Sequence, residues 1–365
     1  MIIVNKKLLF YFTIAIITTI IGSLSLVILP ERFLFDAFTI VNQADSEKGW
    51  LGSYPLTMML YDLSYLNRAP FFVVAFIQTP ILFYLIFKLK IPENFEKLYL
   101  RNILIWLSLI MIAFFIAFPS KEFFNFIFAY LLCLILIAPY NLFKKVTISV
   151  LMLVLFGLVF RPYYILIPII AGTIYLVNFI KLKARLVTAI FFGLLITVFI
   201  SLTHGLVKGE FISESSRESL NETRIEQENQ NADTMIVSPI ATDTFYGEGI
   251  GIFYGFFTVN LPVNALRFIH KPQVIAFVIW QLSLVLLLLF YYRNILAKPL
   301  SYRHEQWVFN ILLAYFIVQG VFEPDLGSAV RHKIGILPLI WIAIYYDKGF
   351  IKKPKLSRKY VFKNV

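Results

Sequence analysis

The sequence predicts an all-helical protein that crosses a membrane about ten times. Of its 365 residues, 59% are hydrophobic and 15% are charged, whereas a soluble domain carries about a quarter charged residues. The apolar residues form runs about as long as a helix needs to cross the hydrocarbon core of a bilayer. The formal net charge of +12 does not indicate nucleic-acid binding, because the basic residues separate apolar runs instead of forming one exposed patch.

Ten apolar runs predict the membrane spans. They are residues 8–29, 71–87, 102–118, 123–140, 146–160, 163–180, 186–203, 273–292, 307–322 and 334–346. A further apolar segment, 249–269, contains glycines and Pro262 and is predicted to be re-entrant or interfacial. We expect residues 1–365 to form a single polytopic membrane domain.

The charged residues predict the orientation of these spans. If the N-terminus is cytoplasmic, the cytoplasmic segments are residues 1–7, 88–101, 141–145, 181–185, 293–306 and 347–365. They hold 21 of the 33 Lys and Arg residues but 4 of the 21 Asp and Glu residues. Positive charge is enriched on the cytoplasmic side of membrane proteins. We therefore expect both termini to be cytoplasmic, with two long outer segments at 30–70 and 204–272.

Three short polar segments join spans on the outer side and are predicted to be turns. They read "PSKEFF" (119–124), "FRPYY" (160–164) and "EPDLGSAVRHK" (323–333). The adjoining runs 146–160 and 334–346 cover about 22 and 20 Å as helices, less than the hydrocarbon core of about 30 Å. We therefore expect Arg161 and Arg331 at or below the outer interface. Charges at that depth tend to line a water-filled cavity or to meet a partner.

Two interpretations of these charges stay open. The arginines can extend to the lipid headgroups and merely mark helix ends. Alternatively, the three segments form one cationic pocket with acids at its rim. The candidate residues of that pocket are Lys121, Glu122, Arg161, Tyr163, Glu323, Asp325, Arg331, His332 and Lys333.

The residue types suggest an anionic ligand. A guanidinium binds two phosphate oxygens at once and a lysine adds a point charge, so a lipid pyrophosphate suits such a pocket at the outer interface. A metal site is not expected, because His204 and His270 lack ligand spacing, and Pro324 separates Glu323 from Asp325.

The two long outer segments each allow two interpretations. In 30–70, Asp36, Asp45 and Trp50 are candidates for sugar binding, together with several tyrosines, yet tyrosine and tryptophan also form the ordinary interfacial belt. The polar part of the second segment, 204–248, is either a lid over the pocket or a solvated loop.

These features together resemble the Wzy-type polymerases of bacterial O-antigen and capsule repeat units, a class of multi-spanning, GT-C-like glycosyltransferases. The resemblance rests on the ten or more spans, "PSKE" at 119–122, "RPYY" at 161–164, the enlarged late outer segment and the closing "GSAVRHKIGILP". One departure is that better-known members place paired arginines in large outer loops, whereas Arg217 and Arg224 here lie in a glutamate-rich stretch. We therefore favour Arg161 and Arg331.

The resemblance implies an activity, a location and partners. A growing glycan would pass from undecaprenyl pyrophosphate to the non-reducing end of another undecaprenyl-pyrophosphate-linked repeat unit, at the periplasmic face of the bacterial inner membrane. No cofactor is implied, and a polysaccharide co-polymerase that regulates chain length is an expected partner. Arg161, Arg331 and Lys121 would stabilise the departing pyrophosphate.

Two questions are left open at this point. The base that accepts the hydroxyl proton would be Glu122, His332 or Glu323. The alternative enzyme is a transferase that takes one sugar from a polyprenyl monophosphate and uses Asp36 or Asp45 as its base. A glycan-lipid flippase is disfavoured, because no internal repeat relates the two halves.

Overall fold

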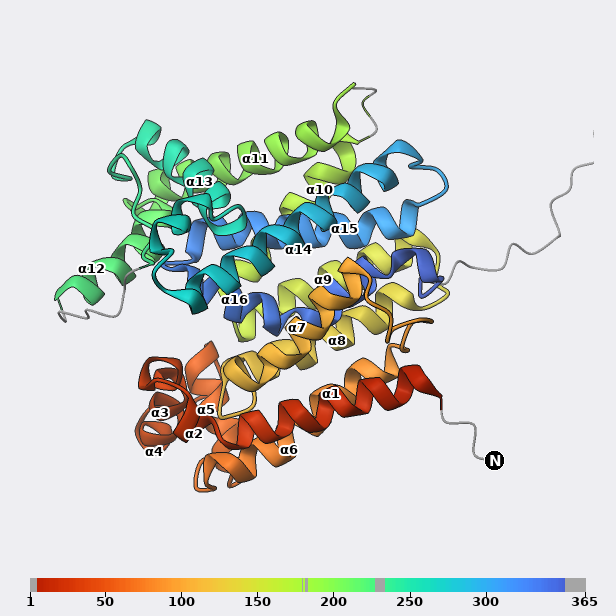
Figure 1. The fold of residues 1–365 in the computed structure, drawn as a ribbon. Helices are drawn as coiled ribbons and strands as arrows, with labels where there is room; N and C mark the ends of the chain where they lie inside the picture. The colour runs from red at the N-terminus through yellow and green to blue at the C-terminus, as the bar shows by residue number, and fades with distance from the viewer. Residues whose placement is uncertain (1–4, 179, 181–182, 227–233, 352–365) are drawn as a thin grey trace, which may run out of the picture.

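The computed structural model describes residues 5–178, 180, 183–226 and 234–351, and these residues form helices without a sheet. Long helices lie roughly side by side in one bundle (Figure 1). They are α1 (Lys6–Ser23), α6 (Phe71–Lys88), α7 (Leu100–Phe115), α8 (Lys121–Ile137), α9 (Leu142–Val159), α10 (Leu166–Val177), α11 (Arg185–Lys208), α14 (Pro272–Ala297) and α15 (Arg303–Phe322). Helix α15 is the central one, with 94% of its span buried among the others.

Each of the ten predicted spans contains a helix, but not all of these helices meet the length expected for a crossing. Among the residues that the structure describes, six helices are long and apolar enough to span a membrane: α1, α6, α9, α11, α14 and α15. Helices α7 and α10 are apolar but shorter. The protein is therefore a helical protein with several candidate membrane spans, and the number ten stays a prediction.

The first outer segment folds into short helices at one end of the bundle (Figure 1). These helices are α2 (Ser25–Ile28), η1 (Glu31–Phe33), α3 (Phe35–Asn42), α4 (Ala44–Glu47) and α5 (Ser53–Leu63). They pack on the ends of the long helices, because Ile40, Met58 and Tyr61 form a small core with Val74 of α6. Residues of this segment can therefore contact the ends of helices that lie much later in the chain.

The last predicted span is a bent pair of helices instead of a short straight one. Helices α16 (Leu326–Gly335) and α17 (Leu337–Ile344) meet at an angle of 71°. Pro338 lies in the first turn of α17, where a missing N–H is tolerated, whereas in the middle of a continuous helix it would break a hydrogen bond.

All three predicted outer turns are wrong in detail, since 160–164 runs into the 3₁₀ helix η2 (Pro162–Ile165) and the other two segments start α-helices. Asp325 caps α16, and residues Arg331 to Lys333 lie within this helix. Ser120 caps α8, and Lys121 and Glu122 occupy its first turn. A capping side chain accepts a hydrogen bond from a free N–H of the first turn, so both polar segments start helices.

The apolar segment predicted at 249–269 is divided between two helices. Helix α13 (Phe245–Asn260) is followed by the 3₁₀ helix η4 (Val263–Phe268). Helix α13 packs closely on α15, since a Cβ at Gly255 would lie 2.0 Å from the carbonyl oxygen of Gly320. Gly255 is thus explained by helix packing, and a re-entrant or interfacial position of the segment stays a prediction.

The polar part of the second outer segment is helical as far as the structure describes it. Helix α11 ends at Gly209, whose φ of 86° favours glycine. A π-helical turn, η3 (Glu214–Glu218), and helix α12 (Ser219–Glu226) follow. Residues 234–236 then pair with the residues that precede α16, through hydrogen bonds from Ile236 N to Pro324 O and from Leu326 N to Thr234 O. This segment is therefore partly docked on the start of α16.

Candidate functional site

Charged residues from all three short outer segments meet at one end of the bundle, together with one carboxylate of the first outer segment. We call this group the outer charge cluster: Asp36, Lys121, Glu122, Arg161, Glu323, Arg331 and His332. The structure therefore places residues of these three segments together, as predicted. The fold brings together residues almost 300 positions apart.

Glu122 is the centre of one half of the cluster. Its carboxylate is completely buried and forms a bidentate pair with the two terminal nitrogens of Arg161. Asn125, one turn later in α8, donates to its Oε2 at 3.2 Å. Gly335 of α16 leaves room for this carboxylate, since a Cβ there would lie 2.5 Å from the same oxygen. Close approach of α16 to α8 therefore shapes the site.

His332 lies between two carboxylates. Its Nε2 is 3.1 Å from Glu122 Oε1, and its Nδ1 is 2.5 Å from Glu323 Oε1. A protonated ring forms an ion pair with both carboxylates, and its Nδ1 then donates to Glu323 Oε1, whereas its Nε2 makes no hydrogen bond among the residues described. Gln319 of α15 also donates to Glu323 Oε1, at 3.1 Å. These contacts fix the orientation of the imidazole.

Asp36 is the centre of the other half. Its Oδ2 lies 2.9 Å from Arg331 Nη1 and 3.3 Å from Lys121 Nζ, and its Oδ1 accepts a hydrogen bond of 2.8 Å from the Tyr54 hydroxyl. Burial alone would raise the pKa of Asp36, but Arg331 and Lys121 outweigh burial and hold that pKa well below its usual range. Asp36 is therefore an ionised carboxylate that ties the first outer segment to α8 and α16.

The arrangement of charges corrects one expectation. A cationic pocket with acids at its rim is wrong, because Glu122 and Glu323 are buried inside the cluster beside the cations. Burial lowers the pKa of Arg161, but the adjacent Glu122 outweighs that effect and holds the pKa well above its usual range. Buried charges are tolerated when each has a partner of opposite sign, so the cluster is closely balanced.

Three other predicted site residues lie next to the cluster. Asp325 is the cap of α16 and accepts from Ser328 N at 2.8 Å and from Ser328 Oγ at 2.9 Å. The Tyr163 ring packs on Phe322, with 5.0 Å between centroids. The buried ammonium of Lys333 lies 5.1 Å from the centre of the Phe316 ring and has no hydrogen-bond partner among the residues that the structure describes.

Two predicted sugar-binding residues do not join this site. Asp45 is exposed on the short helix α4, and the Trp50 side chain is 66% exposed. Among the residues that the structure describes, neither side chain contacts the outer charge cluster. Tyr54 of the same segment does, through its hydrogen bond to Asp36. In the first outer segment, Asp36 and Tyr54 are therefore the residues that contact the cluster, and sugar binding by Asp45 or Trp50 stays a prediction.

Two residues that hydrogen-bond to carboxylates of the cluster were not among the predicted site residues. Asn125 and Gln319 are uncharged and sit inside apolar helices, so nothing marks them by composition. Their spacing was an available signal: Asn125 follows Glu122 by three positions and Gln319 precedes Glu323 by four. Side chains three or four positions apart on a helix are neighbours.

Arg217 is a charged residue of the second outer segment that sequence reasoning set aside. Its side chain is completely buried, and its Nη1 donates to the carbonyl oxygens of Gly251 and Gly320 at 3.3 and 3.0 Å. Arg217 therefore joins η3 to the crossing of α13 and α15. Its hydrogen bonds are with this crossing and not with the cluster.

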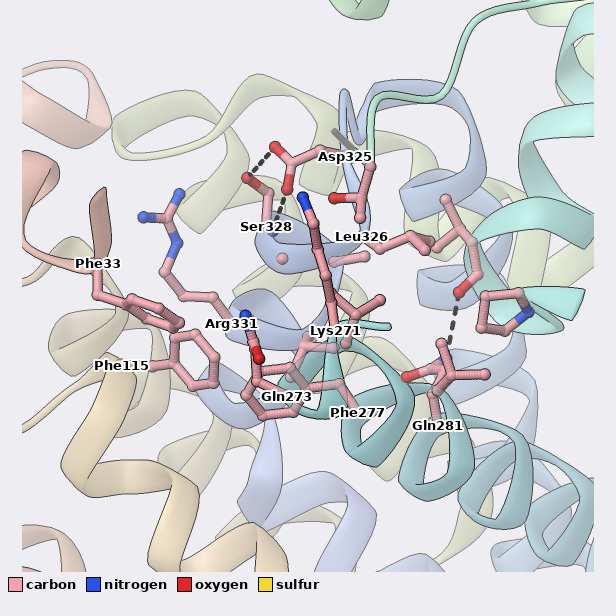
Figure 2. Close-up of a pocket in the computed structure, with 18 of the residues that line it drawn as sticks. Phe33, Phe115, Lys271, Gln273, Phe277, Gln281, Asp325, Leu326, Ser328 and Arg331 are labelled. Atoms are coloured by element: carbon pink, nitrogen blue, oxygen red, sulfur yellow. Dashed lines mark hydrogen bonds between the residues drawn. The ribbon is translucent and has the colours of Figure 1, made fainter. Parts of the chain in front are cut away.

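A cavity of about 260 Å³ adjoins the cluster and shares Asp36 and Arg331 with it. Figure 2 shows it between α14 and α16, with Lys271, Ser328 and Asp325 on one side and Phe33 and Phe115 on another. Within the described ranges, no group of three or more His, Cys, Asp or Glu side chains is placed to hold a metal ion. The site thus offers guanidinium, ammonium, imidazole and carboxylate groups beside an open cavity.

No protein-family model, curated protein or solved structure matches this chain.

Proposed function

We propose that this protein is a lipid-linked glycan polymerase of the outer face of the bacterial inner membrane. In this proposal it transfers a growing glycan from undecaprenyl pyrophosphate to another undecaprenyl-pyrophosphate-linked repeat unit. The observation that supports it best is the convergence of Arg161, Arg331, Lys121 and His332 with three carboxylates at one end of an apolar helical bundle. Such a site can hold an anionic leaving group and accept a proton.

The cations act on the leaving group. As the bond between the anomeric carbon and the pyrophosphate oxygen breaks, its electron pair stays on that oxygen. Arg161 and Arg331 are held in place by Glu122 and Asp36, so their orientation needs little reorganisation when this charge develops. Preorganised donors of this kind lower the barrier most where water is excluded.

We assign the proton transfer to Glu323. The acceptor hydroxyl oxygen forms the new bond to the anomeric carbon, and its proton moves to the base. The Oε1 atom of Glu323 is occupied by His332 and Gln319, whereas its Oε2 has no hydrogen-bond partner within the described parts of the chain. Glu122, in contrast, is bound by Arg161, Asn125 and His332. Glu323 thus has the more available oxygen of the two.

Single-sugar transfer from a polyprenyl monophosphate is less well supported. That reaction was expected to use Asp36 or Asp45 as its base. Asp36 is engaged by two cations that keep its pKa low, which makes it a poor proton acceptor. Asp45 is exposed on α4, outside the cluster. The polymerase proposal needs neither residue as a base.

Deletion of the gene in its source strain, followed by gel separation of the surface and lipid-linked glycans, tests the proposal. Collapse of the ladder to core plus one repeat unit is expected. Loss of the single repeat unit itself would instead indicate an earlier sugar-adding transferase or a flippase.

Complementation with Glu323→Gln and Arg161→Lys then tests the assigned roles. Both variants should fail to restore long chains at wild-type protein levels, because one removes the base and the other the bidentate cation. Asp45→Asn is the matched control and should restore the full ladder. Long chains made by both site variants would contradict the assigned roles.

A further inference from the structure

The loop at residues 49–52 leaves two large apolar side chains outside the fold. Trp50 and Leu51 are 66% and 67% exposed, and we call this pair the loop tip. The backbone that carries the pair is held in place, because Gly49 N donates to Pro55 O at 3.0 Å. Gly52 has a φ of 96°, in the left-handed region that glycine adopts readily. The loop tip is therefore an apolar surface that the fold itself presents to its surroundings.

The loop is attached to one end of helix α9. Gly52 N donates to Val159 O at 2.9 Å, and Val159 is the last residue of α9. The last carbonyl oxygens of a helix have no donor within that helix, so the loop supplies one that α9 lacks. This hydrogen bond holds Trp50 and Leu51 beside the end of α9.

Helix α9 has a surface that is suited to lipid. It is long and apolar enough to span a membrane, yet only 22% of its residues are buried in the protein. Leu151, Leu155 and Leu158 follow one another at spacings of four and three, so they form one stripe along the helix. Their side chains are 55%, 51% and 62% exposed. A helix of spanning length with an uncovered apolar stripe is suited to face the acyl chains of a bilayer.

This stripe leads to the loop tip. Leu158, the last member of the stripe, directly precedes Val159, whose carbonyl oxygen holds the loop. Trp50 and Leu51 therefore extend an apolar surface that begins in the middle of α9. A surface that continues a lipid-facing stripe is most simply covered by the same lipid.

The two residue types favour lipid over a glycan as the partner. A tryptophan ring, apolar with one polar N–H, suits the headgroup level of a membrane. A leucine side chain has no group that can form a hydrogen bond with a sugar hydroxyl, and Leu51 is as exposed as Trp50. The adjacent Lys48 is engaged by Asp62 at 2.5 Å.

We propose that the loop tip is a membrane anchor and that its partner is the bilayer itself. The Trp50 ring lies among the lipid headgroups, and Leu51 reaches the boundary with the acyl chains. This inference does not depend on the proposed function, because it uses no residue of the outer charge cluster.

The anchor sets the depth of the outer charge cluster. Arg161 follows Val159 by two positions, and its backbone N–H donates to Phe156 O of α9 at 3.2 Å. Arg161 therefore lies at nearly the same level along α9 as the loop. With Trp50 in the headgroup layer, Arg161 and its partner Glu122 lie at the interface and not in the water above it.

Fluorescence quenching of Trp50 in vesicles tests the anchor. Trp50 is the exposed one of the five tryptophans, all of which lie in the described parts of the chain. The full-length protein is reconstituted in phosphatidylcholine that is brominated near the top of its acyl chains, or in unbrominated vesicles with iodide on both sides. The difference between wild type and Trp50→Phe isolates the signal of Trp50. Brominated lipid should quench most of that signal, and iodide should quench it several-fold less than free tryptophan in buffer.

A charge in the loop tip should reverse this pattern. Leu51→Asp places a carboxylate where entry into lipid is costly, so brominated lipid should quench Trp50 less and iodide should quench it more. Leu51→Ser serves if the charged variant does not fold. Ser46→Asp is the matched control, since it adds the same charge at an exposed position of α4 and should leave Trp50 quenching as in the wild type.

Two outcomes would overturn the proposal. Quenching by iodide without quenching by brominated lipid would place Trp50 in water, where it is free to stack on a sugar. Quenching by neither would mean that another protein surface covers the loop tip. Neither outcome bears on the glycan ladder of the deletion strain, so the anchor and the polymerase proposal fail separately.

Discussion

Gly335 of α16 lies against the buried carboxylate of Glu122 in α8. A Cβ at position 335 would be 2.5 Å from Glu122 Oε2 and 2.7 Å from Asn125 Nδ2. Glycine at this position therefore allows α16 to bring His332 within 3.1 Å of Glu122 Oε1 in α8, while Arg331 of the same helix pairs with Asp36.

Replacement of Gly335 by alanine is expected to displace Glu122 and weaken the cluster. Overpacking of a buried site costs about 1–3 kcal/mol, so Gly335→Ala should lower the thermal unfolding midpoint of the purified protein and shorten the polymer. Gly172→Ala in α10 is the control, since a Cβ there meets nothing within 4 Å. A Gly335→Ala protein as stable and active as the control would show that the close contact is unimportant.

The Glu122–Arg161 pair is expected to behave as one unit. Removing one partner of a buried ion pair costs about 3–5 kcal/mol, because the other charge is left uncompensated. Glu122→Gln and Arg161→Gln should each destabilise the protein by this amount, while the double variant should lose less than the sum of the two. Chemical unfolding of the four proteins measures this coupling. If the two single changes in the free energy of unfolding simply add up in the double variant, the two side chains do not form a direct pair.

The pH dependence of the Asp36 contacts follows from its lowered pKa. A carboxyl group with a lowered pKa in the folded state stabilises the fold above its unfolded pKa of about 3.9. It loses that contribution only as the pH falls through the folded value. The difference in unfolding midpoint between wild type and Asp36→Asn should therefore be the same at pH 7 and pH 5 and should shrink as the pH falls below about 3.9. A difference that is unchanged between pH 5 and about pH 2.5 would indicate a pKa that is not lowered.

The crossing of α13 and α15 is expected to tolerate no side chain at Gly255. A Cβ there would lie 2.0 Å from Gly320 O and 2.3 Å from Arg217 Nη1. Gly255→Ala should therefore separate the helices and break the hydrogen bond from Arg217 to Gly320, with lower thermal stability and faster proteolysis of the second outer segment. Gly249→Ala in the same helix is the control, because its nearest neighbour would be an ordinary 3.8 Å away. Equal stability of the two variants would disagree with this packing.

Much of the helical structure, and which segments contribute to the candidate site, can be predicted from the sequence. Apolar runs of spanning length predicted the long helices of the bundle other than α13, because a backbone buried in lipid must close its hydrogen bonds within the helix. Alternating loop charge predicted that segments 119–124, 160–164 and 323–333 share one side. That placement was enough to nominate Lys121, Glu122, Arg161 and Arg331 together.

The predicted secondary structure was wrong where a polar segment starts a helix. Residues 323–333 were expected to form a turn, yet Asp325 caps α16 and the charged residues follow on its faces. Composition also does not separate Asp36 and Tyr54, which contact the cluster, from Asp45 and Trp50, which are exposed. Only the packing of α3 and α5 on the bundle distinguishes them.

The sequence by itself determined that the chain is helical and apolar, and which charged residues lie near one another on one side. The tertiary structure decided which charges pair, because partners such as Asp36 and Arg331 are almost 300 positions apart and no periodicity connects them. It also decided that the acids lie inside the cluster, that Arg217 is buried, and that a cavity opens beside Arg331. These features depend on how closely helices approach at Gly335, Gly255 and Gly320, and such distances are set by packing in three dimensions.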